Sequence, residues 1–187
     1  MATYPAPDLI TALVDRCRHG DRRAQYDLYS RYAKAMYNVC LRIVVHQAEA
    51  EDVLQEAFLD AFTNLHRFRA ESTFGAWLKQ IVVNRAIGHL RNRRLLLVST
   101  ETVTVDAFDR PDDGGGVDEE AIEWDVERVR RAMLTLPEGY RVVLSLYLFE
   151  GYDHEEIGQI LGIGESTSRS QYLRAKKKLV DQIKGHS

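Results

Sequence analysis

Apolar residues recur every three or four positions along most of the chain, which is the spacing that gathers them on one face of an α-helix. In the first half, this pattern predicts helices that begin near Asp8 and Arg22, a third helix over 49–65 and a fourth over about 73–94. The helical spacing returns at Val126 and continues towards the end of the chain. No segment alternates apolar and polar residues between hairpin signals, as a β-strand would. The expected fold class is therefore all-α, with two small helical domains.

The segment 153–179 has the pattern of a helix-turn-helix. Asp153 and Glu156 are spaced as a capping box that begins a short helix, and Gly162 is placed to end that helix in a left-handed conformation. Gly158 leaves room for a second helix to pack closely. The inner face of that second helix would be formed by Ser168, Tyr172, Ala175 and Leu179. The hydroxyl of Ser168 is unusual there, because a β-branched apolar residue is expected on this inner face.

The outer face of the second helix is rich in cations and hydrogen-bonding groups, as is typical of a helix that enters the major groove of DNA. The hydroxyl and amide groups that can contact base edges belong to Ser166, Thr167, Ser170 and Gln171. The cations that can contact phosphates belong to Arg169, Arg174, Lys176, Lys177 and Lys178. A basic helix can also be an ordinary solvated surface, but the order of short helix, glycine turn and basic helix favours DNA binding.

The helix over 49–65 has one apolar face and one acidic face. Carboxylates and histidines at helical spacing can ligate a metal or act as an acid and base pair. His46 and His66 lie outside the acidic cluster, however, and no second helix repeats the carboxylates as a two-metal bundle requires. We therefore expect a face that is solvated or binds a protein partner, with no catalytic residue, metal or cofactor.

A short polar joint at 66–73 precedes the fourth helix, and the two together combine aromatic and basic residues. Phe68 is expected to be exposed, and Trp77 is most simply a core residue. Aromatic groups beside arginines and an asparagine can also stack on splayed bases and hold a nucleic-acid backbone. The residues of this candidate surface are Arg67, Phe68, Arg69, Ser72, Trp77, Asn84, Arg85, Arg91 and Arg93.

Charge divides the chain into three parts. The segment 99–127 holds eleven acidic residues and one base, Arg110, so its net charge is -10, which leaves +7 for the rest of a chain whose total is -3. Low hydrophobicity and like charges keep such a segment extended. We therefore expect domains at 1–95 and 126–187, joined by a flexible acidic linker at 96–125.

Other features of the composition exclude several classes of protein. No apolar run approaches the roughly 20 residues that cross a bilayer. The first residues lack the apolar core of a signal peptide, so the expected location is the cytoplasm. Cys17 and Cys40 lack the CxxC or CxxH spacing of a metal site, and we expect two buried thiols.

Four stretches of the chain together resemble the extracytoplasmic-function sigma factors, the minimal branch of the bacterial initiation factors of RNA polymerase. They are AEDVLQEAFLDAFTNLHRF, STFGAWLKQIVVNRAIGHLRNRR, the acidic linker, and LPEGYRVVLSLYLFEGYDHEEIGQILGIGESTSRSQYLRAKKKL. The resemblance implies a region-two domain followed by a region-four domain. Ser168 and Gln171 stand where the family often has valine and arginine, and Gly88 where it often has aspartate, so the promoter sequence is not carried over.

The same resemblance implies a partner for each candidate surface. The third helix would dock on the clamp helices of core RNA polymerase through Asp52, Val53, Gln55, Glu56, Phe58 and Leu59. The joint and the fourth helix would open promoter DNA at the minus-ten element and capture a flipped base of the non-template strand. The last helix would read the minus-thirty-five element. The family also implies an anti-sigma factor as a partner, often at the membrane, and no small-molecule substrate.

The expected function is thus that of an alternative sigma factor, which directs promoter-specific initiation in response to stress. The main alternative is a two-domain helix-turn-helix regulator of the response-regulator type, which does not act through core polymerase. That alternative needs an alternating β/α receiver domain, and the first half of the chain has no such strands. A third interpretation is an interaction protein whose basic helix binds an acidic partner.

Overall fold

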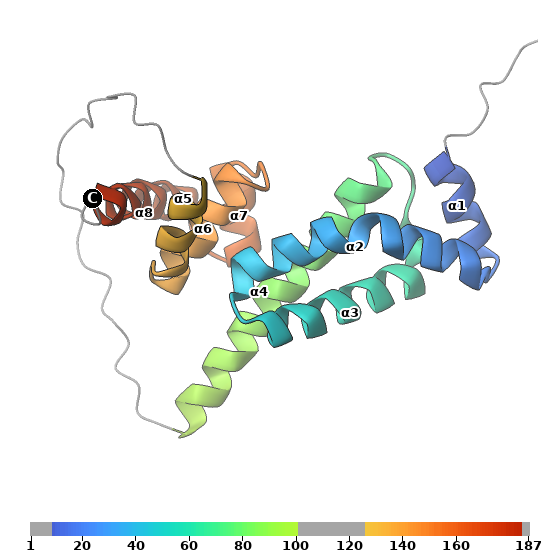
Figure 1. Ribbon diagram of the computed structural model, residues 1–187, viewed down its shortest axis with the longest axis horizontal. Coiled ribbons are helices and arrows are strands. Elements are labelled where there is room, and N and C mark those ends of the chain that lie inside the picture. Colours follow the sequence, from blue (N-terminus) through green and yellow to red (C-terminus); the bar gives the residue numbers. More distant parts are fainter. Residues whose placement is uncertain (1–8, 101–125, 185–187) are drawn as a thin grey trace, which may run out of the picture. The chain divides into compact units, whose positions relative to one another are not determined.

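The computed structural model describes residues 9–100 and 126–184, with the side chains of these ranges except 95–100, 126–128 and 130. The chain divides into two units, Met1–Arg91 and Asn92–Ser187. Every regular element of the described ranges is a helix, as the apolar spacing predicts (Figure 1). The predicted linker lies outside the described residues from 101 onwards.

Four α-helices and one short 3-10 helix form the first unit, and the last of them extends beyond it. They are α1 (Leu9–Arg18), α2 (Arg22–Val44), α3 (Gln47–Thr63), η1 (Leu65–Arg67) and α4 (Phe74–Thr100). The predicted third helix ends earlier than expected: Asn64 is its C-cap, with a non-helical φ of -100° and ψ of 16°, and the side-chain nitrogen of Asn64 donates to the carbonyl oxygen of Asp60. The fourth helix continues past its predicted end at 94.

Local capping fixes where α2 begins. The side chain of Asp21 accepts hydrogen bonds from the backbone nitrogens of Arg23 and Ala24, at 2.9 and 3.1 Å, and so caps the helix. Its other carboxylate oxygen lies 2.7 Å from the guanidinium of Arg16. The Arg16 hydrogen bond, together with the backbone donors, lowers the pKa of Asp21. These partners favour the charged carboxylate, which is the form that caps α2.

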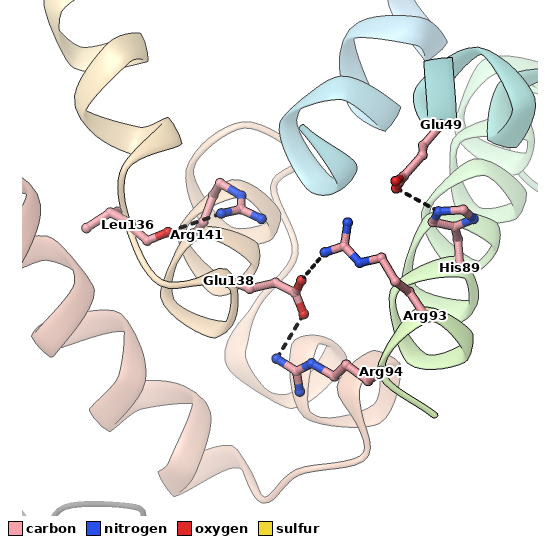
Figure 2. Close-up of polar contacts among 7 residues, drawn as sticks. All are labelled: Glu49, His89, Arg93, Arg94, Leu136, Glu138 and Arg141. Atoms are coloured by element: carbon pink, nitrogen blue, oxygen red, sulfur yellow. Dashed lines mark hydrogen bonds and ion pairs between the residues drawn. The ribbon is translucent and has the colours of Figure 1, made fainter. Parts of the chain in front are cut away.

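One face of α4 is buried from Phe74 to Leu90. Five residues of this face, spaced four positions apart in the sequence, are almost inaccessible to solvent. They are Phe74, Leu78, Val82, Ala86 and Leu90. The face packs against both neighbouring long helices. The Phe74 ring lies 5.4 Å from the Tyr32 ring of α2, and His89 Nε2 lies 2.8 Å from a carboxylate oxygen of Glu49 on α3 (Figure 2). These contacts determine which side chains of α4 point outwards.

The second unit is organised around its last helix. Its elements are the end of α4, α5 (Val126–Leu134), α6 (Glu138–Leu148), α7 (His154–Leu161) and α8 (Glu165–Lys184). The last helix, α8, contacts each of α5, α6 and α7. The apolar core of the unit consists of Met133, Leu136, Leu144, Ala175, Leu179 and Ile183. Arg141 of α6 is also buried, and its Nη1 donates to the carbonyl oxygen of Leu136 at 3.1 Å (Figure 2).

The predicted helix-turn-helix is confirmed in α7 and α8. Both bonds of the capping box are present, from Glu156 N to Asp153 Oδ1 at 2.8 Å and from Asp153 N to Glu156 Oε2 at 2.9 Å. Gly162 ends α7 with a φ of 71°, in the left-handed region that glycine adopts without strain. A Cβ atom on Gly158 would lie 2.8 Å from the carbonyl oxygen of Ile163, so this turn approaches the helix too closely for any other residue.

We predict that Gly158→Ala destabilises the helix-turn-helix by about 1–3 kcal/mol, because the added methyl group meets backbone that cannot rotate away. Gly139→Ala is the matched control, since a Cβ atom at Gly139 of α6 has nothing within 4 Å. Amide hydrogen exchange of α7 and α8 in the full-length protein measures both changes. Faster exchange is expected in the first variant alone, and equal exchange in the two variants would contradict the close approach.

Candidate nucleic-acid interface

A cavity of about 370 Å³ lies in the first unit between the end of α3, η1 and the first half of α4. This volume falls within the usual range of small-molecule sites. Its lining residues are Asp60, Asn64, Arg67, Trp77, Ile81, Asn84 and Arg85. Those on α4 are spaced by four, three and one, which places them on a single face of the helix. The two from the end of α3 are four residues apart and share a face in the same way.

The ring of Phe68 packs against Trp77, one of the cavity residues. The prediction that Phe68 is exposed is wrong. The side chain of Phe68 is only 7% exposed. Its ring lies edge-on to Phe74 at 5.7 Å and against Trp77 at 5.4 Å, and this aromatic packing buries it. Phe68 therefore cannot stack on a base in this structure. Trp77 is half-buried and lines the cavity, so it serves both as a core residue and as a potential stacking surface.

The cavity is lined by both positively and negatively charged side chains. The guanidinium of Arg85 bonds to the carboxylate of Asp60, and its Nη1 lies 3.4 Å from Glu56. Part of its charge is thus already balanced by α3. Arg67 and Asn84 are exposed at the cavity, and the amide of Asn84 can both donate and accept hydrogen bonds.

The structure brings together some of the predicted minus-ten residues and leaves others apart. Arg67, Trp77, Asn84 and Arg85 line the cavity. Arg69, Ser72 and Arg91 are exposed but do not line it. Arg93, in the part of α4 that belongs to the second unit, lies 2.6 Å from the carboxylate of Glu138, which also receives Arg94 at 2.8 Å (Figure 2).

Sequence reasoning missed three lining residues, namely Asp60, Asn64 and Ile81. The sequence pattern places Asp60 only on an acidic face and Ile81 only in the core. The signal that could have found them is the shared helical face: Ile81 follows Trp77 by one turn, and Asn64 follows Asp60 by one turn.

The predicted polymerase surface on α3 divides into exposed and buried residues. Four members form one exposed stripe at helical spacing, and they are Asp52, Gln55, Glu56 and Leu59. Leu59 is 69% exposed, which is unusual for a leucine in the interior of a helix. Val53 and Phe58 are buried, in contrast to their predicted role, because they lie on the face of α3 that packs into the unit. The Phe58 ring lies 4.7 Å from that of Tyr29 on α2.

The basic helix α8 exposes most of the residues predicted to contact DNA. Ser166, Arg169 and the three lysines Lys176, Lys177 and Lys178 are exposed, whereas Thr167, Ser170, Gln171 and Arg174 are half-buried. Arg169 and Ser170 have partners within the helix. The guanidinium of Arg169 bonds to Glu165 Oε1, which raises the pKa of Arg169, and Ser170 Oγ donates to the carbonyl oxygen of Thr167 at 3.0 Å.

Ser168 has a specific partner that explains a hydroxyl on the inner face of α8. Its side chain is fully buried, and its Oγ lies 3.0 Å from Nδ1 of His154 at the start of α7. The His154 ring stacks on Tyr147 at 4.7 Å and meets Tyr172 edge-on at 5.5 Å. The polar pair therefore holds the two helices of the motif together within an aromatic cluster.

Comparison with known proteins agrees with this arrangement. Residues 28–95 match the family described as sigma-70 region 2, and residues 126–179 match sigma-70, region 4. The RNA polymerase sigma-H factor of Pseudomonas aeruginosa is 33% identical over 171 residues, which cover 88% of this chain and 89% of that protein. The ECF RNA polymerase sigma-E factor of Haemophilus influenzae is 31% identical over 180 residues, covering 92% and 94%. The chain belongs to the extracytoplasmic-function sigma factors.

Solved structures share the fold of this sigma factor. The sigma factor RpoE in complex with the anti-sigma factor NepR from Bartonella quintana has a TM-score of 0.56 at 21% identity, over 84% of this chain and 97% of that one. CnrH in complex with the cytosolic domain of CnrY has a TM-score of 0.55 at 22% identity, over 94% and 97%.

As a sigma factor, the protein binds core RNA polymerase and directs initiation at specific promoters. Its family is one of transcription initiation factors. Within the described ranges, no group of three or more histidine, cysteine or carboxylate side chains is arranged to hold a metal ion. No helix in those ranges is sufficiently long and apolar to span a membrane.

We predict that replacing Lys176, Lys177 and Lys178 with glutamine weakens duplex binding, mainly because the variant neutralises fewer phosphates. The slope of log K against log salt should fall by about 0.9 for each lysine that neutralises a phosphate in the wild type. The binding of the sigma factor to a duplex containing its minus-thirty-five element, titrated at several salt concentrations, measures this slope. An unchanged slope would show that these lysines do not face DNA.

Proposed function

We propose a specific division of labour for this sigma factor. The exposed stripe of α3 contacts core polymerase, the cavity between α3, η1 and α4 receives an unpaired base of the minus-ten element, and the first half of α8 reads the minus-thirty-five element. The observation that carries the proposal is the cavity, because it gathers Trp77, Arg67 and Asn84 at one site.

The cavity has the chemistry that base capture requires. Extruding a base from duplex DNA costs a few kcal/mol. Stacking on an aromatic ring contributes about 1–3 kcal/mol per base, and the indole of Trp77 provides such a surface. The amide of Asn84 can pair with the edge of the base, and the exposed guanidinium of Arg67 can contact the adjoining phosphate.

The second unit offers a separate surface for duplex DNA. Side chains near the start of a recognition helix contact base edges, and later cations contact the backbone. Here the residues proposed to contact base edges are Ser166, Thr167, Ser170 and Gln171. Those proposed to contact the DNA backbone are Arg169, Arg174 and the lysines. One such helix discriminates weakly between sequences. Attachment of both units to polymerase raises the effective concentration of each for its own element.

The domain limits predicted from the sequence, 1–95 and 126–187 around a linker at 96–125, form part of this proposal. The family matches at 28–95 and 126–179 support these limits. We further propose that the protein acts in the cytoplasm under the control of an anti-sigma factor, by analogy with the complex of RpoE and NepR. It would respond to stress and catalyse no covalent chemistry itself, since polymerase synthesises the RNA.

Reconstituted transcription tests the proposal as a whole. The sigma factor and core polymerase are combined on a random promoter library, and the selected promoter is then transcribed with each component alone and with both. Transcripts are expected only from the combination. Sequence-specific DNA binding without any polymerase-dependent initiation would instead favour a helix-turn-helix regulator.

We predict that Asn84→Ala lowers the equilibrium constant for promoter opening by about two- to tenfold, because one hydrogen bond to the captured base contributes about 0.5–1.5 kcal/mol. A fluorescent base analogue in the minus-ten element reports this opening. Gln80→Ala is the matched control, since it removes an exposed amide from the same helix outside the cavity. Equal effects of the two substitutions would argue against base capture in the cavity.

We predict that Leu59→Ser weakens binding to core polymerase by about 10- to 100-fold, since burying a leucine side chain contributes about 1.5–3 kcal/mol. Leu9→Ser removes a similarly exposed leucine, 58% accessible, from α1 and serves as the control. Competition with labelled wild-type protein for core polymerase measures both. Retention of full affinity by the Leu59 variant would place the polymerase contact elsewhere.

A further inference from the structure

The first helix, α1, belongs to none of the surfaces assigned above. It also lies outside residues 28–95, which match sigma-70 region 2. Yet α1 contacts η1 as well as α2. Nη2 of Arg18, its last residue, donates a hydrogen bond to the carbonyl oxygen of Phe68, 2.5 Å away and 50 residues later in the chain. We propose that Arg18 is a positioning residue for the minus-ten cavity, an inference that rests on the function proposed above.

Phe68 is the residue through which such a bond would act. It directly follows Arg67, which lines the cavity. Its own ring packs at 5.4 Å against Trp77, which lines the same cavity from α4. Fixing the backbone of Phe68 therefore positions two cavity residues of different chemistry, one a cation and one an aromatic ring.

The segment after Phe68 has little support of its own. Residues 69–73 are all exposed, and Ala70 has a φ of 57°, in the left-handed region that costs free energy for a residue with a Cβ atom. At the far end, Thr73 Oγ1 accepts a hydrogen bond from the backbone nitrogen of Ala76 at 3.2 Å and begins α4. The near end is held by the ring of Phe68, by the bond from its backbone nitrogen to the carbonyl oxygen of Leu65 at 3.2 Å, and by Arg18. Of these three contacts, only the Arg18 bond holds the carbonyl of Phe68, from which the strained segment continues, so its loss lets that peptide rotate in the direction that relieves Ala70.

The bond between Arg18 and Phe68 differs from an ordinary surface contact. Arg18 also pairs with Asp15 on its own helix, at 3.1 Å, and exposed ion pairs of this kind contribute little. Its bond to Phe68 is partly buried and joins a charged donor to a neutral carbonyl, which is a stronger arrangement. The two roles of the guanidinium can therefore be separated by substitution.

The test uses full-length variants assembled with core polymerase. The first probe is a single-stranded non-template oligonucleotide with the minus-ten element of a promoter selected by the wild-type holoenzyme. The second probe is the same oligonucleotide with an abasic site at the base whose loss most weakens wild-type binding. Arg18→Met should bind the complete oligonucleotide at least about tenfold more weakly, the lower end of the loss expected for one charge-assisted hydrogen bond, and the abasic one as the wild type does. Arg18→Lys, which retains a cationic donor, should recover part of the loss.

Two matched controls accompany these variants. Asp15→Asn removes only the ion pair within α1, and Arg16→Met makes the same change of charge at a residue that pairs with Asp21 instead. Both should leave both affinities unchanged. Competition for core polymerase verifies that each variant is folded, and Arg18→Lys is assessed by the same criterion if Arg18→Met fails to bind.

Three results would overturn the inference. Equal weakening of both oligonucleotides would mean that Arg18 supports the fold in general, and no weakening would mean that its bond does not position the cavity. A wild-type holoenzyme that binds the two oligonucleotides equally would refute base capture itself. The first two results leave the proposed function intact, so the two failures are distinguishable.

Discussion

The first unit depends on α4 burying one of its faces completely while the neighbouring face stays open. Phe74, Leu78, Val82, Ala86 and Leu90 form a continuous stripe one turn apart, and its burial fixes the rotation of the helix about its axis. This rotation turns the neighbouring face towards the cavity, which is the face that carries Trp77, Ile81, Asn84 and Arg85. Burial of apolar residues does not itself recognise a DNA sequence, but it orients the side chains that can contact DNA.

In the second unit, α8 likewise buries one face in the core and exposes another to solvent. Ala175, Leu179 and Ile183 belong to the core, while the lysines between them remain in solvent. The inner face includes one polar residue, Ser168, whose bond to His154 ties α8 to the preceding helix. A hydrogen bond at this point is directional, so it specifies how the two helices meet as well as holding them together.

Much of this architecture could be predicted from the sequence because it is encoded locally. The capping groups Asp21 and Asp153, the left-handed Gly162 and the period of the apolar residues each act within one or two helical turns. The burial of Phe68 was not predicted because it does not depend on local sequence. Phe74 and Trp77 reach its ring only after the joint folds back. The bond from Arg18 spans 50 residues and follows no periodic pattern. At the candidate site, the period of the apolar residues already places Val53 and Phe58 on the buried face of α3, and only the family resemblance assigned them to the polymerase surface.

Site-specific crosslinking shows whether α4 and α8 contact two different segments of promoter DNA. A photoreactive amino acid is placed at Ile81 on α4 or at Gln171 on α8, and each holoenzyme is irradiated on the same promoter. We expect the α4 probe to label only the unpaired non-template strand at the minus-ten element, and the α8 probe to label only duplex DNA at the minus-thirty-five element. Labelling of a single DNA segment by both probes, or of the duplex by the α4 probe, would contradict this expectation.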